Sequence, residues 1–145
     1  MILFTTGDIL ALLTEAGLEL PPASFDRWSR ENIFTPVSGG IGTGNHRQWS
    51  LMQAVGFLVA IELYKSDRGC AVSFLGVCVT DFGKVSEEWL AGEIVQGRHF
   101  YCRPHLGRPL LTGEGKQYEW PNVAAAYKRV LKYAEKKQRT AKGRS

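Results

Sequence analysis

The sequence of 145 residues contains few of the residue types that form disulfides or bind metals. It has three cysteines, three histidines and two methionines. Three cysteines cannot all pair within one chain, so we expect a reducing cytoplasm rather than an oxidising compartment. His99, Cys102 and His105 follow one another at intervals of three, but tetrahedral metal sites usually take four closely paired ligands. We therefore expect neither a metal nor a cofactor.

The chain also lacks hydrophobic runs of the kind that enter a membrane. The longest apolar stretch, residues 51–64, is interrupted by a glutamine, a glycine and a glutamate, and it is too short to span a bilayer. Residues 1–4 do not have the basic start and extended apolar segment of a signal peptide. We expect a cytoplasmic protein that makes no contact with a membrane.

Groups of residues that perform catalysis are missing as well. No nucleophile is accompanied by a base and an orienting group, and no pair of carboxylates indicates acid–base chemistry. The glycine-rich residues 38–45 do not fit a nucleotide-binding loop, which needs a strand before it and a helix directly after it. Here Pro36 precedes the glycines, and five residues separate Gly44 from the next helix cap, Ser50. We do not expect an enzyme.

Positive charge is concentrated in the last third of the chain, although the formal net charge is only +4. Residues 1–50 carry three Lys and Arg against five Asp and Glu, and residues 51–97 carry three against six. Residues 98–145 carry twelve against three. Basic charge favours a polyanionic partner, so this C-terminal part either shares the contact of the motif described next or binds something else.

Two short helices joined by a tight turn are predicted near the start of the chain. Thr6 suits the cap of the first helix, and a glycine ends it. The second helix is expected from Pro22 to about Glu31, where Phe25 and Trp28 share one face. This is the composition of a helix-turn-helix, but an αα-hairpin without a ligand has the same composition.

A hairpin, or wing, is predicted after the second helix. Asn32 tolerates the left-handed conformation that often ends a helix. Residues 33–37 suit an extended strand and the glycine-rich residues 38–45 suit a tip. The return strand follows, with Arg47 and Trp49 on one side of the pleat. Arg47 therefore comes directly after the tip, where it is well placed to contact a phosphate.

A longer helix is predicted to follow the wing. Ser50 and Gln53 fit a capping box, so this helix begins at Leu51 and runs to about Lys65. It is apolar nearly all round, which predicts that it is buried.

The N-terminal residues resemble the MerR-type winged helix. The resemblance lies in residues 6–9 (TGDI), residues 28–34 (WSRENIF), residues 44–50 (GNHRQWS) and Gln53, and it covers residues 4–66. It implies a bacterial transcription regulator that binds double-stranded DNA as a homodimer. The second helix would enter the major groove, and basic residues of the wing would contact the DNA backbone.

Five residues are the candidates for DNA contact, with mostly phosphate-positioning roles. They are Ser24, Arg27, Arg30, His46 and Arg47. The resemblance makes Arg47 the wing arginine and Arg30 a basic residue that flanks the aromatic one. Asp26 stands where the family commonly has an arginine, and its carboxylate would repel a phosphate.

The remaining residues, 67–138, are expected to form a dimerisation or sensing region. Residues 70–82 fit either a helix or a buried strand, and we favour a helix. Residues 86–95 predict a helix capped by Ser86. Its expected buried side chains are Trp89, Leu90 and Ile94.

A hairpin and a last helix complete the prediction. Residues 99–103 and 110–112 suit two strands on either side of residues 104–109. The last helix runs from Pro121 or Asn122 to about Gln138, with an apolar stripe that either packs on its own domain or pairs with a second copy. A basic tail, residues 139–145, should be disordered.

Together these features predict a mostly α fold with small β elements. A winged helix-turn-helix at residues 1–66 precedes the second region and the tail. Our main hypothesis is a homodimeric, DNA-binding transcription regulator of MerR-like type whose effector is unknown. The alternatives are an excisionase-like architectural protein that bends DNA, and a protein-interaction module that no longer binds DNA. Asp26 and the acidic N-terminal half favour the last of these.

Overall fold

The structure, a computed structural model, describes residues 2–39, 47–66, 70–114 and 119–143, with residues 141–143 described by their backbone alone. Within these ranges the protein is mostly helical, with two small two-stranded antiparallel sheets, as predicted. The elements follow in the order β1 (Leu3–Thr5), α1 (Thr6–Glu15), α2 (Pro22–Arg30), β2 (Gln48–Ser50), α3 (Leu51–Lys65), α4 (Val72–Gly83), α5 (Glu87–Val95), β3 (Tyr101–His105), β4 (Arg108–Thr112) and α6 (Val123–Gly143).

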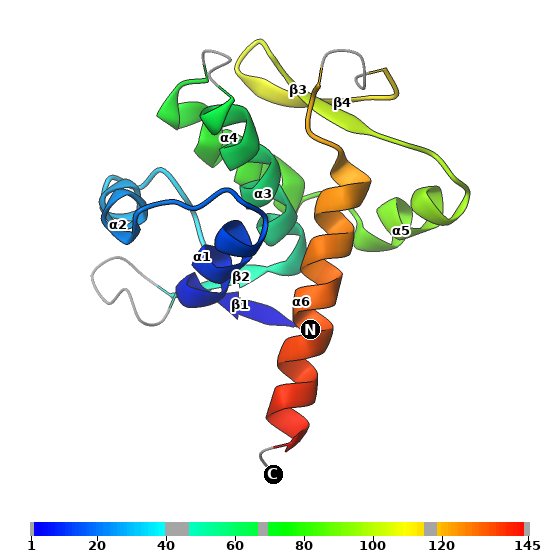
Figure 1. Ribbon diagram of the computed structural model, residues 1–145. Helices are drawn as coiled ribbons and strands as arrows, with labels where there is room; N and C mark the ends of the chain where they lie inside the picture. The colour runs from blue at the N-terminus through cyan, green and yellow to red at the C-terminus, as the bar shows by residue number, and fades with distance from the viewer. Residues whose placement is uncertain (1, 40–46, 67–69, 115–118, 144–145) are drawn as a thin grey trace.

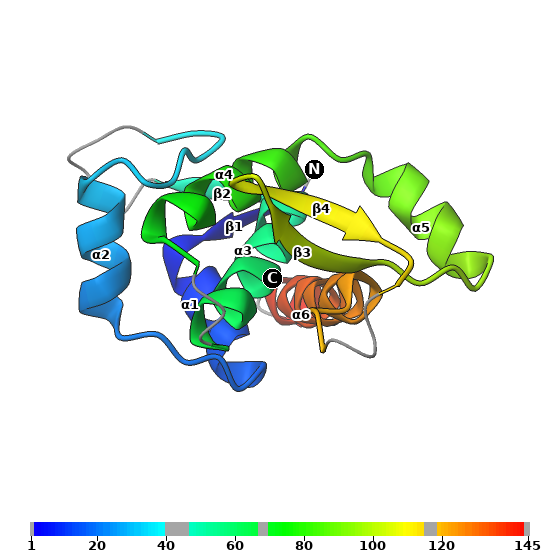
Figure 2. The same ribbon diagram turned by 90° about the horizontal axis from the view of Figure 1, so that it is seen from above.

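The central helices separate two peripheral ones. In Figures 1 and 2, α2 and α5 lie at opposite ends of the molecule, with α3, α4 and α6 between them. One hydrophobic cluster includes residues from β1 to α6, so the core extends through both parts of the chain that the sequence suggested. No helix in the described ranges combines the length and the apolarity needed to cross a bilayer.

The first sheet joins the start of the chain to the end of the predicted wing. Strand β1 pairs antiparallel with β2, and Phe4 lies opposite Trp49. Thr5, not Thr6, caps α1: its hydroxyl accepts from the amide of Asp8, whose carboxylate accepts from the amide of Thr5. The predicted cap was one residue too late. The extended Thr5 forms a reciprocal capping box with Asp8, the acidic residue at the third helical position.

The buried helix α3 has the bounds that the sequence predicted. Ser50 and Gln53 form the predicted capping box, and twelve of the fifteen residues are buried. Helix α4 confirms the helix favoured for residues 70–82, although it begins at Val72 and ends at Gly83. It packs against α3. The two approach closely at Gly56, where a Cβ atom would lie 2.9 Å from the Cβ of Phe82.

The segment between α4 and α6 differs in detail from the prediction. Ser86 caps α5 and Leu90 is buried, as expected. Trp89 was expected to be buried but is 44% exposed, because α5 lies at the periphery and, among the ring contacts of the described residues, the Trp89 ring packs only against Phe100. Strand β3 has the predicted length but begins two residues later than expected. Strand β4 begins two residues earlier than expected, so the turn between the strands is shorter. Pro104 and Pro109 pair within the ladder, where a two-stranded sheet tolerates proline because each strand is an edge strand.

The last helix, α6, packs on its own chain. Its buried residues belong to the core shared with α3 and α1: Val123, Ala126, Tyr127, Val130 and Ala134. Of the two arrangements left open for the apolar stripe, the structure therefore has the intramolecular one. The helix continues to Gly143 rather than ending near Gln138, so residues 139–143, which we expected to be disordered, are helical.

Candidate nucleic-acid interface

Helix α2 is held to the core by one aromatic face. Phe25 and Trp28 are buried, and the ring of Phe25 lies 5.4 Å from that of Phe34 and 5.5 Å from that of Phe57. The Trp28 ring meets Tyr64 edge-on at 5.4 Å. The spacing of three between Phe25 and Trp28 places both on the same side of the helix, as predicted. Helix α2 is therefore attached to the core through an apolar, aromatic contact surface.

The opposite face of α2 is directed to solvent and carries the predicted contact residues. Arg27 and Arg30 are exposed, and Ser24 is partly buried. Arg30 lies 3.1 Å from Asp26, and the two side chains are 70% and 60% exposed. Such an exposed pair is weak, so Arg30 is only partly neutralised. The helix lies at the edge of the molecule, away from the C-terminal half of α6 (Figure 1).

The chain on either side of the glycine-rich segment is paired. The amide of Val37 donates to the carbonyl of Gln48 at 2.9 Å, and the amide of Gln48 donates to the carbonyl of Ser38 at 2.9 Å. The hydroxyl of Ser38 donates to the side chain of Gln48 at 2.8 Å. A single antiparallel bridge therefore joins Ser38 to Gln48. Residues 33–37, which we expected to be a strand, form none, and β2 pairs with β1 instead. Residues 40–46, which include His46, lie outside the described residues.

Arg47 is not presented to solvent as the sequence suggested. Only 8% of its surface is exposed. Arg47 directly precedes β2, and burial alternates from Arg47 to Trp49, with Gln48 between them only partly buried, as expected for an extended chain. The buried side faces the core, where Trp49 is fully buried against Phe25, Phe34 and Phe57. The prediction had the alternation right and the exposed face wrong.

Asn32 ends α2 in the predicted left-handed conformation, with φ of 58°. The chain then turns against α4, where Ile33 and Gly76 meet. Gly76 is needed there, because a Cβ atom would lie 1.9 Å from the carbonyl oxygen of Ile33. This contact fixes the exit of α2, and a lone glycine in an apolar sequence gives no sign of it.

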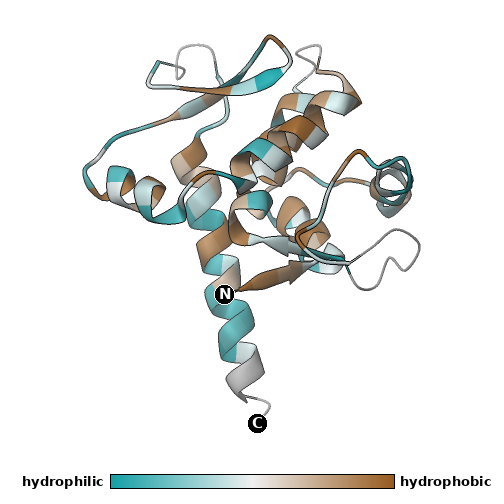
Figure 3. Ribbon diagram, turned by 180° about the vertical axis from the view of Figure 1, so that it is seen from behind, coloured by the Kyte–Doolittle hydropathy of each residue, from teal (hydrophilic) through white to brown (hydrophobic). Residues whose placement is uncertain are grey.

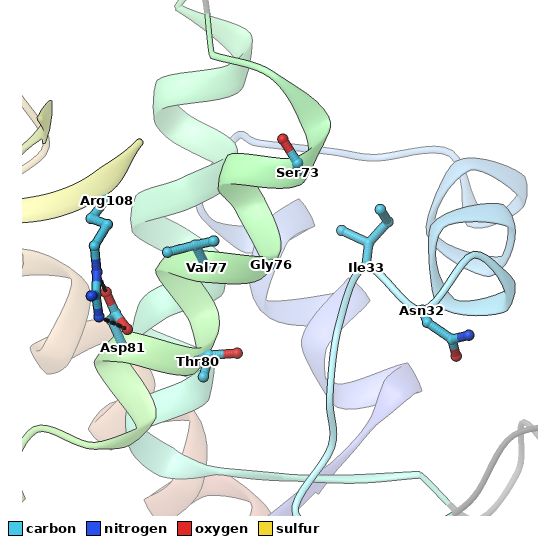
Figure 4. Close-up of a pocket in the computed structure, with 8 residues that line it drawn as sticks. All are labelled: Asn32, Ile33, Ser73, Gly76, Val77, Thr80, Asp81 and Arg108. Carbon is cyan, nitrogen blue, oxygen red and sulfur yellow. Dashed lines mark hydrogen bonds and ion pairs between the residues drawn. The ribbon is translucent and has the colours of Figure 1, made fainter. Parts of the chain in front are cut away.

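A hollow of about 540 Å³ opens beside this contact (Figure 4). Asn32 and Ile33 form one side, and α4 forms the other with Val77 and small hydroxyl side chains. At its far end Arg108 donates two hydrogen bonds, of 3.1 and 3.0 Å, to the carboxylate of Asp81. The charged residues that line the hollow are this one pair, so its lining carries no net charge to attract an anionic ligand.

Sequence reasoning missed a polar cluster that binds α6 to α1. Asp8 accepts hydrogen bonds from the Tyr133 hydroxyl at 2.8 Å and from Lys137 Nζ at 2.5 Å, besides its capping bond. Burial alone would raise the pKa of Asp8, but its hydrogen bonds to Lys137, Thr5 and Tyr133 outweigh burial and lower it. The pKa of Tyr133 is raised by burial and by the Asp8 carboxylate. No local spacing could have indicated a contact between residues so far apart in the chain.

The three residues considered for a metal do not converge. Cys102 is buried in β3, whereas His99 and His105 are exposed. Among the described residues, no group of three or more His, Cys, Asp or Glu side chains is arranged to hold a metal ion. Comparisons with protein-family models, with curated proteins and with solved structures found no match for this chain.

Proposed function

We propose that the protein binds double-stranded DNA through α2 and the adjoining hairpin, as a winged helix-turn-helix of MerR-like type. One observation carries the proposal. Helix α2 is anchored by Phe25 and Trp28, while its other face presents Arg27 and Arg30 to solvent. A single helix of this kind fits the major groove, and arginine binds phosphates and base edges.

The order of elements supports the same proposal. Strand, two helices, bridged hairpin base and buried helix follow one another in residues 3–65. Within this unit Arg27 has the main role in phosphate contact, since within the described residues no ion pair involves its side chain. We assign Arg30 a smaller role because Asp26 partly neutralises it. A homodimer, and a role in regulating transcription, remain part of the proposal.

The proposal is tested by fluorescence anisotropy with a random-sequence duplex at salt concentrations from about 50 to about 200 mM. Arg27→Ala should weaken binding on every sequence and flatten the slope of log K against log salt by about one unit. Arg98→Ala is the control, because Arg98 is an exposed arginine that follows α5, the helix at the end of the molecule opposite α2 (Figure 2). Arg98 pairs with Glu93 at 2.8 Å, so the fold of this variant is checked by circular dichroism. Equal effects of the two substitutions would count against α2 as the contact helix.

Two observations favour a protein-interaction module as the second candidate. Asp26 pairs with Arg30 on the outer face of α2, and Arg47 is buried. Both reduce the positive charge available to DNA near the motif. If the folded protein fails to bind any duplex even at about 50 mM salt, where electrostatic binding is strongest, this second candidate replaces the first. Cooperative binding to arrayed sites would instead indicate an architectural role in bending DNA.

A further inference from the structure

One face of α6 carries much of the positive charge that the helix-turn-helix lacks. Its exposed basic side chains, called here the basic face, are Lys128, Arg129, Lys132, Lys136 and Arg139. At 3.6 residues per turn they fall within an arc of roughly 100°, which points away from the buried stripe of the same helix. In Figure 3 the C-terminal half of α6 is mostly hydrophilic and extends beyond the rest of the molecule.

Acidic neighbours leave most of this charge uncompensated. Glu15 lies 3.8 Å from Lys136, but the two side chains are 53% and 73% exposed, so their pairing is weak. Burial raises the pKa of the Glu62 carboxyl and the charge of Arg129 opposes that rise, so Arg129 lies near one acidic group. Glu135 is exposed on α6 itself, at the edge of the arc, three residues after Lys132 and four before Arg139. In the part of the chain that the structure describes, no ion pair is found for Glu135 or for Lys128, Lys132 and Arg139.

The shape of the surface favours an extended ligand over a small one. A hollow of about 280 Å³ lies between α1 and α6, lined by Leu12, Glu15 and Tyr133 together with three residues of the basic face. This volume is at or below the lower end of the range for small-molecule pockets, roughly 300 Å³. The cations also continue along the helix past the hollow, to Arg139.

The length of the basic face matches a run of phosphates. From Lys128 to Arg139 the helix rises by about 16 Å, at about 1.5 Å per residue. One strand of duplex DNA carries a phosphate for about every 3.4 Å of its axis, so the face spans four or five phosphates, as an order of magnitude. In Figure 1 the C-terminal half of α6 projects beyond the other elements.

We propose that the basic face of α6 binds the sugar–phosphate backbone of a DNA duplex, as a contact surface separate from α2. Charge complementarity and length carry the proposal. An acidic membrane is a poorer match, because the arc holds no aromatic or leucine side chain to insert among lipids. The proposal names the same partner as the proposed function, but it depends on different residues, so the two can fail separately.

A triple variant of the full chain tests it. Lys128→Gln, Lys132→Gln and Arg139→Gln together remove three charges, while glutamine keeps the helix propensity of α6 close to that of lysine and arginine. The control is Lys84→Gln, Arg98→Gln and Arg103→Gln, which lowers the net charge equally at positions outside α2 and α6 and removes one ion pair, between Arg98 and Glu93. Binding of a random-sequence duplex is measured across the salt range, with circular dichroism to check the helix content.

The basic-face variant should flatten the salt slope by about two to three units, because each lost phosphate contact removes about 0.9. At about 100 mM salt its affinity should fall by at least roughly tenfold, whereas the control should change much less. Equal losses in both variants overturn the inference, even if Arg27→Ala shows that α2 binds DNA. A loss of binding to phosphatidylserine vesicles with DNA binding unchanged also overturns it. If only the basic-face variant loses binding, and Arg27→Ala binds DNA as tightly as the unchanged protein, the inference is supported and α2 is not part of the interface.

Discussion

The exit of α2 depends on a glycine in another helix, and this dependence can be measured. Gly76→Ala would place a Cβ atom 1.9 Å from the carbonyl oxygen of Ile33, where 3.4–4 Å is an ordinary contact. The neighbour is backbone and cannot rotate away, so the segment at Ile33 or helix α4 must shift. Overpacking of this kind typically destabilises a protein by about 1–3 kcal/mol, whereas replacing a helical glycine by alanine stabilises the helix by only about 0.5–1 kcal/mol. The middle values of these two ranges give a net loss of stability of about 1 kcal/mol.

Gly92→Ala is the control for this prediction. Gly92 also lies inside a helix, α5, and a Cβ atom there would meet nothing within 4 Å. It should therefore stabilise the protein by about 0.5–1 kcal/mol, the ordinary gain on replacing a helical glycine. Urea unfolding followed by circular dichroism gives both values from the shift in midpoint at constant slope. If Gly76→Ala is as stable as Gly92→Ala, α4 does not seat the exit of α2 as described.

Three further substitutions test the core, a helix end and the α1–α6 contact. Trp28→Ala should cost about 3–5 kcal/mol, because it empties the aromatic seat of α2, and a loss below about 1 kcal/mol in urea unfolding would refute that seat. Asn32→Gly should raise the melting temperature slightly, since glycine adopts the observed φ of 58° without strain; a lower melting temperature would contradict this. The lowered pKa of Asp8 means that its bonds to Tyr133 and Lys137 stabilise the fold above its ordinary pKa of 3.8 and are lost as pH falls through the folded value. Asp8→Asn should therefore destabilise the protein at neutral pH and much less near pH 3; an equal loss at both would show that the charge is not involved.

Local sequence signals predicted most helices because their ends depend on neighbouring residues. Ser50 and Gln53 are three residues apart, which is enough to place the start of α3. Asn32 and Ser86 likewise act within one turn of the helix that they end or cap. The bounds of α2 and α3 follow from such signals with an error of at most one residue.

Exposure was harder to predict because it depends on distant parts of the chain. Trp89 was expected to be buried from its neighbours in the helix, yet α5 lies at the periphery and leaves it 44% exposed. Arg47 was expected at the surface because it follows the glycine-rich tip, yet it directly precedes β2, a strand that pairs with β1, and its side chain is buried. The sequence could not tell whether the apolar stripe of α6 packs on its own chain or on a second copy, because the stripe indicates only that it contacts some apolar surface.

The central claim is that the outer face of α2 contacts DNA, and a nuclear magnetic resonance titration tests it most directly. A random-sequence duplex is added to the full-length, isotope-labelled protein, and backbone amide shifts are followed. The account predicts changes at Ser24, Arg27 and Arg30, in addition to those along the basic face of α6, with the buried helix α3 little affected. Shifts that leave these three residues unchanged while the duplex binds elsewhere would contradict it.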